Sequence, residues 1–177
     1  MAAKRTLRIG LGEIDKAMAE VERIKRNVQA NTSRLITRLA QAGVEIASAR
    51  LLAHGAISEG ELDAGMHYLI EDKGDGTLRA YIRTDSDHAA FVEFGTGVRG
   101  AETPHPTLPW AYDIHGHGAG GWWDPTTASD PNPTKRRAKD GTFWAWTAGM
   151  PARPFMYETA RELRERVGDM AKEEFSS

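Results

Sequence analysis

The 177-residue sequence contains no cysteine. This absence excludes disulfides, thiolate nucleophiles and cysteine-based zinc sites, and it fits a reducing compartment such as the cytoplasm. No apolar run approaches the ~18 residues that a membrane-spanning helix needs. The basic residues at the start of the chain are not followed by the apolar segment of a signal peptide. We therefore expect no membrane partner.

A strong charge of one sign is also missing, because the formal net charge is only −2. A dedicated nucleic-acid-binding domain usually carries a clear basic excess. A local basic patch remains compatible with this balance. With 40% hydrophobic and 27% charged residues, the composition indicates a soluble protein with a modest core. At this length we interpret residues 1–177 as a single domain.

Proline is absent from residues 13–53, and glycine occurs there only at Gly43. These residues are therefore predicted to form a long helix. A continuous helix of some 40 residues would span about 60 Å at 1.5 Å per residue, which is more than a domain of this size covers. We therefore expect either a break, with Gly43 as a candidate bend, or a contact with another subunit. Lys25 and Thr32 interrupt an apolar stripe whose spacing of three and four marks one helix face: Ile14, Met18, Val21, Val28, Leu35, Leu39, Ala42, Ile46 and Ala49.

Residues 66–71 and 78–84 are typical of two strands joined by a turn. The segment between them contains Asp75-Gly76, a common hairpin signal. Residues 89–94 follow, and both a short helix and a third strand fit them. The Gly-Thr-Gly sequence at 95–97 then ends the regular pattern, because glycine permits sharp turns.

Residues 97–141 hold most of the prolines and tryptophans of the chain. We predict a long irregular loop here that becomes ordered on meeting a partner, since tryptophans favour burial. Residues 142–147 are typical of another strand, and a helix is predicted from Pro154 onward. Together these elements predict an α+β fold. It consists of a long N-terminal helix or helix pair, a small antiparallel sheet of three to four strands, a C-terminal helix and the 97–141 loop.

A metal-dependent hydrolase is one functional alternative, because imidazoles and carboxylates gather in this loop. The candidate ligands for zinc or nickel are His105, Asp113, His115, His117 and Asp124. The sequence motifs typical of hydrolases are missing, however, since there is no His-Glu-x-x-His and no Gly-x-Ser-x-Gly. We therefore expect no enzymatic activity, no resident metal and no other cofactor.

A DNA-contacting module is a second alternative, suggested by the one dense basic cluster. Aromatic residues near clustered cations are typical of nucleic-acid contacts. Four charges neutralise only a few phosphates, so such binding would be weak and sensitive to salt. A solvated loop, or a loop that faces an acidic neighbouring subunit, explains the cluster equally well. The cluster comprises Lys135, Arg136, Arg137 and Lys139, close in sequence to Trp122 and Trp123.

Two motifs occur in order: Ala-Phe-Val-Glu-Phe-Gly-Thr at residues 90–96 and Pro-Ala-Arg-Pro-Phe-Met at residues 151–156. This pair resembles the tail-completion, or neck, proteins of long-tailed bacteriophages, which are head–tail joining or minor tail components. The resemblance covers residues 13–171 and agrees with the predicted order of elements. The 97–141 loop is longer than the family pattern implies.

The resemblance implies a structural protein of the virion neck that joins head and tail without catalysis. Its expected partners are other copies of itself in a ring, with a hexamer as the first expectation and a dodecamer as the alternative. The head-side connector and the tail terminator or tail tube would be its neighbours. DNA would be only a non-specific contact in the lumen. Assembly in the host cytoplasm and localisation in the virion tail or neck follow from this expectation.

The resemblance also assigns roles to residues. Phe91 and Phe94 are expected to hold the root of the loop, with Phe155 docking the last helix beside them. Arg153 is expected to be the charge partner of Glu93. The anchors taken together are Phe91, Glu93, Phe94, Gly95, Thr96, Arg153, Pro154 and Phe155. The residues expected to face a partner are Trp110, Trp122, Trp123, Lys135, Arg136, Arg137 and Lys139.

Overall fold

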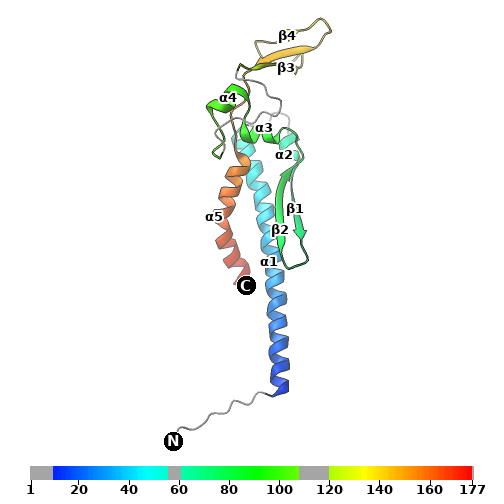
Figure 1. The fold of residues 1–177 in the computed structure, drawn as a ribbon, viewed down its shortest axis with the longest axis vertical. Coiled ribbons are helices and arrows are strands. Elements are labelled where there is room, and N and C mark those ends of the chain that lie inside the picture. The colour runs from blue at the N-terminus through cyan, green and yellow to red at the C-terminus, as the bar shows by residue number, and fades with distance from the viewer. Residues whose placement is uncertain (1–9, 56–60, 108–119, 177) are drawn as a thin grey trace.

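The computed structural model describes residues 10–55, 61–107 and 120–176 and confirms the predicted α+β class. The molecule is elongated along its longest helix (Figure 1). Its helices are α1 (Leu11–Ala53), α2 (Glu61–Ala64), α3 (Ala89–Phe94), α4 (Gly97–Glu102) and α5 (Phe155–Phe175). Its strands are β1 (Met66–Asp72), β2 (Leu78–Thr84), β3 (Trp122–Thr126), β4 (Arg136–Arg137) and β5 (Phe143–Thr147).

The predicted N-terminal helix is confirmed as α1, which runs without interruption for 43 residues. Of the two alternatives expected for this helix, the break at Gly43 does not occur. A Cβ built on Gly43 would lie 2.1 Å from Cδ1 of Ile82 and 3.1 Å from Cδ1 of Leu163. Glycine therefore lets the hairpin and α5 approach the helix backbone, and its role is close packing rather than chain flexibility.

The C-terminal half of α1 carries the core of the molecule. Helix α5 lies beside it, and the β1–β2 hairpin covers another side of the same half (Figure 1). The N-terminal half of α1 extends past the end of α5 and past the hairpin. The buried apolar cluster is correspondingly small and consists of Ala47, Leu51, Leu62, Met66, Val92 and Phe155.

The predicted hairpin is confirmed, with β1 and β2 antiparallel from the Met66–Thr84 pair to the Asp72–Leu78 pair. The expected single sheet is wrong, because the strands form two separate sheets. Strand β5 confirms the prediction for residues 142–147, but β3 and β4 pair with its two edges in the order β3-β5-β4. With both edges occupied, β5 cannot extend the hairpin. The three-stranded sheet lies at the end of the molecule opposite the start of α1.

The predicted irregular loop is therefore wrong for part of residues 97–141, which contain α4, β3 and β4. Pro125 lies within β3, an edge strand, where a missing N–H breaks no ladder hydrogen bond. Residues 89–94, which fit either a short helix or a third strand from sequence, form helix α3. The C-terminal helix is confirmed as α5, with Pro154 at its N-cap position rather than in its first turn. No helix within the described ranges is long and apolar enough to cross a membrane.

Candidate functional site: a buried junction and two exposed apolar surfaces

The two sequence motifs meet in the structure and form what we call the junction, residues 92–96 with residues 149–157. Thr96 and Met150 exchange backbone hydrogen bonds, with N–H to O distances of 2.9 and 3.2 Å. The Arg153 N–H donates to the carbonyl of Val92 at 2.8 Å. Segments more than fifty residues apart in the sequence are therefore joined by their backbones. This pairing fixes the start of α5 against α3.

Two glycines make this approach possible. Gly95 has a φ of +72°, and a Cβ built on it would lie 2.6 Å from the backbone N of Ala152. Gly149 has a φ of +87°, and its Cβ would lie 2.0 Å from the carbonyl O of Thr96. Both the backbone angle and the available space exclude a side chain at these positions. The glycines of the junction are thus required by its geometry.

Glu93 is buried in the junction and lies at the start of α5. Its Oε2 accepts the N–H of Met156 at 2.8 Å, and its Oε1 accepts the N–H of Tyr157 at 2.9 Å. The N-cap residue of α5, Pro154, offers no side-chain cap of its own. The carboxylate from α3 therefore satisfies two N–H groups in the first turn and places negative charge at the positive end of the helix dipole.

His105 completes the surroundings of this carboxylate. Its Nδ1 accepts the N–H of Thr107 at 3.2 Å, so the ring hydrogen lies on Nε2, which donates to Oε1 of Glu93 at 3.0 Å. The imidazole also lies against the ring of Phe94, with 4.8 Å between centroids, and edge-on to Tyr157 at 5.4 Å. A buried acid with three hydrogen-bond donors is well stabilised, and these bonds tie α3, the segment after α4 and the first turn of α5 together.

One expectation about these anchors is wrong. The charge partner of Glu93 is not Arg153, because backbone N–H groups and His105 occupy its carboxylate. Phe94 does not join Phe155 in the core cluster, and neither does Phe91. In helix α3 it is Val92 that points into this cluster. The sequence pattern indicates His105 only as a metal ligand, although a buried acid such as Glu93 requires a donor, and this requirement is a signal for a partner such as His105.

The proposed metal ligands are not brought together in the described part of the chain. His105 is committed to Glu93, and Asp124 lies on β3. Asp113, His115 and His117 lie outside the described residues. Within residues 10–55, 61–107 and 120–176, no group of three or more His, Asp or Glu side chains could hold a metal ion.

The first exposed apolar surface, which we call the aromatic face, lies on the β3-β5-β4 sheet. Trp123 pairs directly with Trp146 across the sheet, so the two side chains share one face, and they are 40% and 38% exposed. Trp144 pairs with Pro125 and Arg136 on this same face. The Arg136 guanidinium lies 4.8 Å from the centre of the Trp123 ring, a cation–π contact.

The other residues expected to face a partner are less available. Trp122 is half-buried and covers Gly97, whose Cβ would lie 2.7 Å from the Trp122 ring. The Lys135 ammonium donates to the carbonyl of Ala128 at 2.6 Å and to that of Asp130. Arg137 lies over the Phe143 ring at 5.8 Å, and Lys139 is exposed. Trp110 lies outside the described residues.

The second exposed apolar surface lies on the first half of α1, where every residue from 10 to 30 is exposed. We call it the free stripe. The stripe ends where α5 begins to cover α1, at Asn31, whose Nδ2 donates to the Glu174 carbonyl at 3.0 Å. The large apolar side chains exposed here are Leu11, Ile14, Met18, Val21, Ile24 and Val28.

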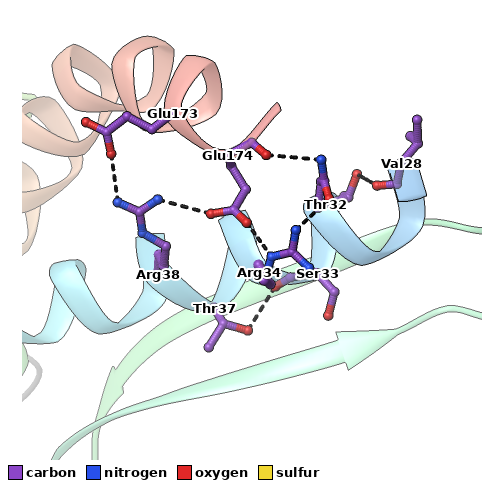
Figure 2. Close-up of polar contacts among 9 residues, drawn as sticks. Val28, Thr32, Ser33, Arg34, Thr37, Arg38, Glu173 and Glu174 are labelled. Carbon is purple, nitrogen blue, oxygen red and sulfur yellow. Dashed lines mark hydrogen bonds and ion pairs between the residues drawn. The ribbon is translucent and has the colours of Figure 1, made fainter. Parts of the chain in front are cut away.

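Ion pairs hold α5 against α1 at both ends. Figure 2 shows Glu174 between Arg34 and Arg38, with the Arg38 guanidinium 3.1 Å from Glu174 and 2.9 Å from Glu173. The Arg34 hydrogen bond, followed by that from Arg38, holds the pKa of Glu174 below its ordinary value. At the other end, Arg50 pairs with Glu162 at 2.8 Å. The C-terminal limit of the free stripe is therefore set by where α5 ends.

Comparison with known proteins adds no relative: no protein family, no characterised protein and no solved structure matches the chain.

Proposed function

We propose that this chain is a structural protein of the neck of a long-tailed bacteriophage and joins head and tail as part of an oligomeric ring. The observation that supports this most directly is the junction. The two motifs on which the resemblance depends are in contact, and each supplies a group that the other uses: the Glu93 carboxylate accepts the Met156 N–H, and the Arg153 N–H donates to the Val92 carbonyl. Two motifs that form one structural unit support the resemblance to phage neck proteins better than two short motifs that lie apart would.

The distribution of apolar surface supports a connecting role. The free stripe of α1 and the aromatic face lie at opposite ends of the elongated molecule (Figure 1). Exposed apolar patches of this kind mark contacts with other proteins. A subunit with one such surface at each end is suited to bridge two neighbours. In the proposed neck these would be another copy of the chain at one end and an adjacent neck protein at the other, either the head-side connector or the tail terminator or tail tube.

The ring itself requires contacts between copies of the chain. Heterologous contacts close into a ring when the rotation between neighbours fits, and six copies match the six-fold symmetry of tails. The mass of the purified protein, together with negative-stain images of it and of isolated necks, tests this proposal. Rings of about six or twelve copies are expected in necks. Necks that form normally without this chain would contradict the proposal.

Complementation tests the connecting role in phage. A phage that lacks this gene receives the chain, or its Trp123→Ser/Trp146→Ser variant, from a plasmid. We expect this variant to fold, because both side chains are partly exposed, and to leave heads and tails unjoined. Tyr68→Ser/Tyr81→Ser is the matched control, since these tyrosines are 37% and 40% exposed but lie on the hairpin. Equal yields of complete virions from both variants would refute a role for the aromatic face.

A contact with DNA is the second candidate function, favoured by one observation. The Arg136 guanidinium over Trp123, next to Trp146, provides a stacking surface with a positive charge. Retention of the protein on immobilised single- and double-stranded DNA, measured against salt concentration, tests it. A lumen contact predicts weak retention that disappears at moderate salt, whereas retention unchanged by Arg136→Gln would exclude this surface as the cause.

A further inference from the structure

The free stripe of α1 has no covering element in the described part of the molecule. It begins at the first turn and extends to Val28, near the tip of the hairpin, over roughly 25 Å of helix. Its exposure is high, with Leu11, Met18 and Val21 at 83%, 63% and 61%. Helix α5 ends before it can reach these residues, as the Asn31–Glu174 hydrogen bond shows. Isolated helices with such a face are normally stabilised by a partner.

The spacing of the stripe indicates what kind of partner fits. Successive positions along it are separated by three and four residues in turn, a period of 3.5 that is typical of a two-helix coiled coil. A second helix of the same period is therefore the natural cover. One position of the series is polar, Lys25, and one apolar residue, Ile24, lies at its edge. The series is Leu11, Ile14, Met18, Val21, Lys25 and Val28.

The series is complementary to the same series on a second copy when the two helices run antiparallel. In an antiparallel pair, Leu11 lies opposite Val28 of the second copy, Ile14 opposite Lys25, and Met18 opposite Val21. All six positions then fall into complete layers around a two-fold axis that passes between residues 19 and 20. A two-fold contact of this kind joins two copies through the same patch on each.

Charge also favours the antiparallel arrangement. The first part of the free helix carries four acids and one lysine, Glu13, Asp15, Lys16, Glu20 and Glu22, whereas residues 23–26 carry Arg23, Lys25 and Arg26. Arg23 already pairs with Glu20 on its own helix. Lys25 would lie over Ile14 of the second copy, and its ammonium could reach Asp15, the next residue. A parallel pair in register would instead place Lys25 against Lys25.

We propose that the free stripe of α1 is the contact between two copies of this chain, which pair as antiparallel helices about a two-fold axis. This inference depends on α1 alone and does not require the phage-neck function. Because a two-fold contact uses only this helix, it leaves the aromatic face available for other partners. A single charged position within an apolar seam fixes orientation and register, and Lys25 has that role here.

The mass of the full chain in solution, measured by sedimentation over a wide concentration range, tests the contact. The chain is expected to be a dimer that dissociates on dilution. Met18→Asp/Val21→Asp should weaken the dimer by at least about 100-fold, since it places unpaired carboxylates in the central layer. Ala19→Asp/Ala30→Asp is the matched control, with equal added charge at exposed positions off the stripe. Circular dichroism checks that each variant remains helical.

Charge exchange tests the Lys25–Asp15 pairing. Lys25→Asp and Asp15→Lys should each weaken the dimer by about tenfold, and the double variant should recover most of this loss. If the double variant is no better than either single variant, the antiparallel pairing is wrong.

Directed cross-linking tests orientation, because the chain has no cysteine of its own. Leu11→Cys and Val28→Cys are prepared separately, oxidised alone and oxidised as a mixture. The antiparallel pair predicts a disulfide only in the mixture. A Leu11→Cys dimer formed alone would indicate a parallel pair and overturn the proposal. A chain that remains a monomer at every concentration, or whose stripe is covered only when a different protein is added, would also overturn it. None of these results depends on whether the chain complements a phage.

Discussion

The Nε2 atom of His105 lies 3.0 Å from Oε1 of Glu93, and the two side chains are only 4% and 9% exposed. The same carboxylate accepts the N–H groups of Met156 and Tyr157. It therefore connects α3, the segment after α4 and the first turn of α5. Since buried polar groups are costly when unpaired, loss of this carboxylate would leave several donors of the junction without an acceptor.

Glu93→Gln should destabilise the fold. The amide NH₂ of glutamine replaces one carboxylate oxygen, so at least one N–H of α5 or the His105 Nε2–H loses its acceptor. We expect a loss of about 1–3 kcal/mol in the free energy of unfolding. Urea denaturation followed by circular dichroism measures it. Glu102→Gln, at an exposed position on α4, is the control and should be neutral. Equal stability of the two variants would show that Glu93 does not hold the junction.

Phe155→Ala should cost more than Phe94→Ala. Phe155 is fully buried in the core cluster, so its truncation should remove about 3–5 kcal/mol of stability. Phe94 is only partly buried and lies against His105, so its truncation leaves a smaller cavity. Denaturation midpoints of the two variants under the same conditions give the comparison. A larger loss for Phe94→Ala would mean that the loop root, and not the start of α5, is the main anchor.

Gly43→Ala and Gly168→Ala should change stability in opposite directions, although both lie inside helices. Alanine favours a helix over glycine by roughly 0.5–1 kcal/mol, and a Cβ on Gly168 meets no atom within 4 Å. At Gly43 the Cβ would overlap Ile82, and overpacking typically costs about 1–3 kcal/mol. Thermal unfolding should show a higher midpoint for Gly168→Ala and a lower one for Gly43→Ala. Equal increases would mean that the hairpin moves away from α1 at little cost.

Acid should weaken the contact between α1 and the end of α5. Hydrogen bonds from Arg34 and then Arg38 hold the pKa of Glu174 below its ordinary value of 4.5. A carboxyl with a lowered folded-state pKa stabilises the fold above its unfolded pKa, and this contribution is lost as the pH falls through the folded value. Glu174→Gln should therefore reduce stability near pH 7 and matter little once the pH is well below 4.5.

The measurement is the difference in unfolding free energy between the native chain and Glu174→Gln, taken at several pH values. Glu165→Gln, on an exposed part of α5, gives the pH dependence of an unpaired surface carboxylate. A difference for Glu174→Gln that stays constant from neutral to acidic pH would rule out the proposed ion-pair origin.

The elements with a regular residue pattern could be predicted from the sequence. Apolar residues spaced by three and four predicted α1 and α5. The Asp75-Gly76 turn between two strand-like segments predicted the hairpin. Strand β3 was missed because Pro125 lies within it and glycines precede it, which are signals of irregular structure. Its pairing with β5 depends on contacts across the sheet that no local pattern encodes.

The junction was predictable only in part. The motifs indicated that Glu93 and the start of α5 matter, but charge alone suggested Arg153 as the partner. The actual donors include backbone N–H groups, which every residue except proline carries and which no sequence pattern distinguishes. His105 follows Glu93 by twelve residues and lies between two prolines. Its contact with the Glu93 carboxylate depends on the turn that the chain makes after α4.

The uninterrupted course of α1 has a mechanical consequence. A continuous helix acts as a strut whose length is set by residue number, at about 1.5 Å per residue. Deleting seven residues ahead of Asn31 would draw the tip of the strut about 10 Å closer to the body and leave its remaining apolar side facing the same way. Deleting two would turn the tip by more than half a revolution. Any assembly built on this strut should therefore tolerate shortening in steps of seven and fail at steps of two.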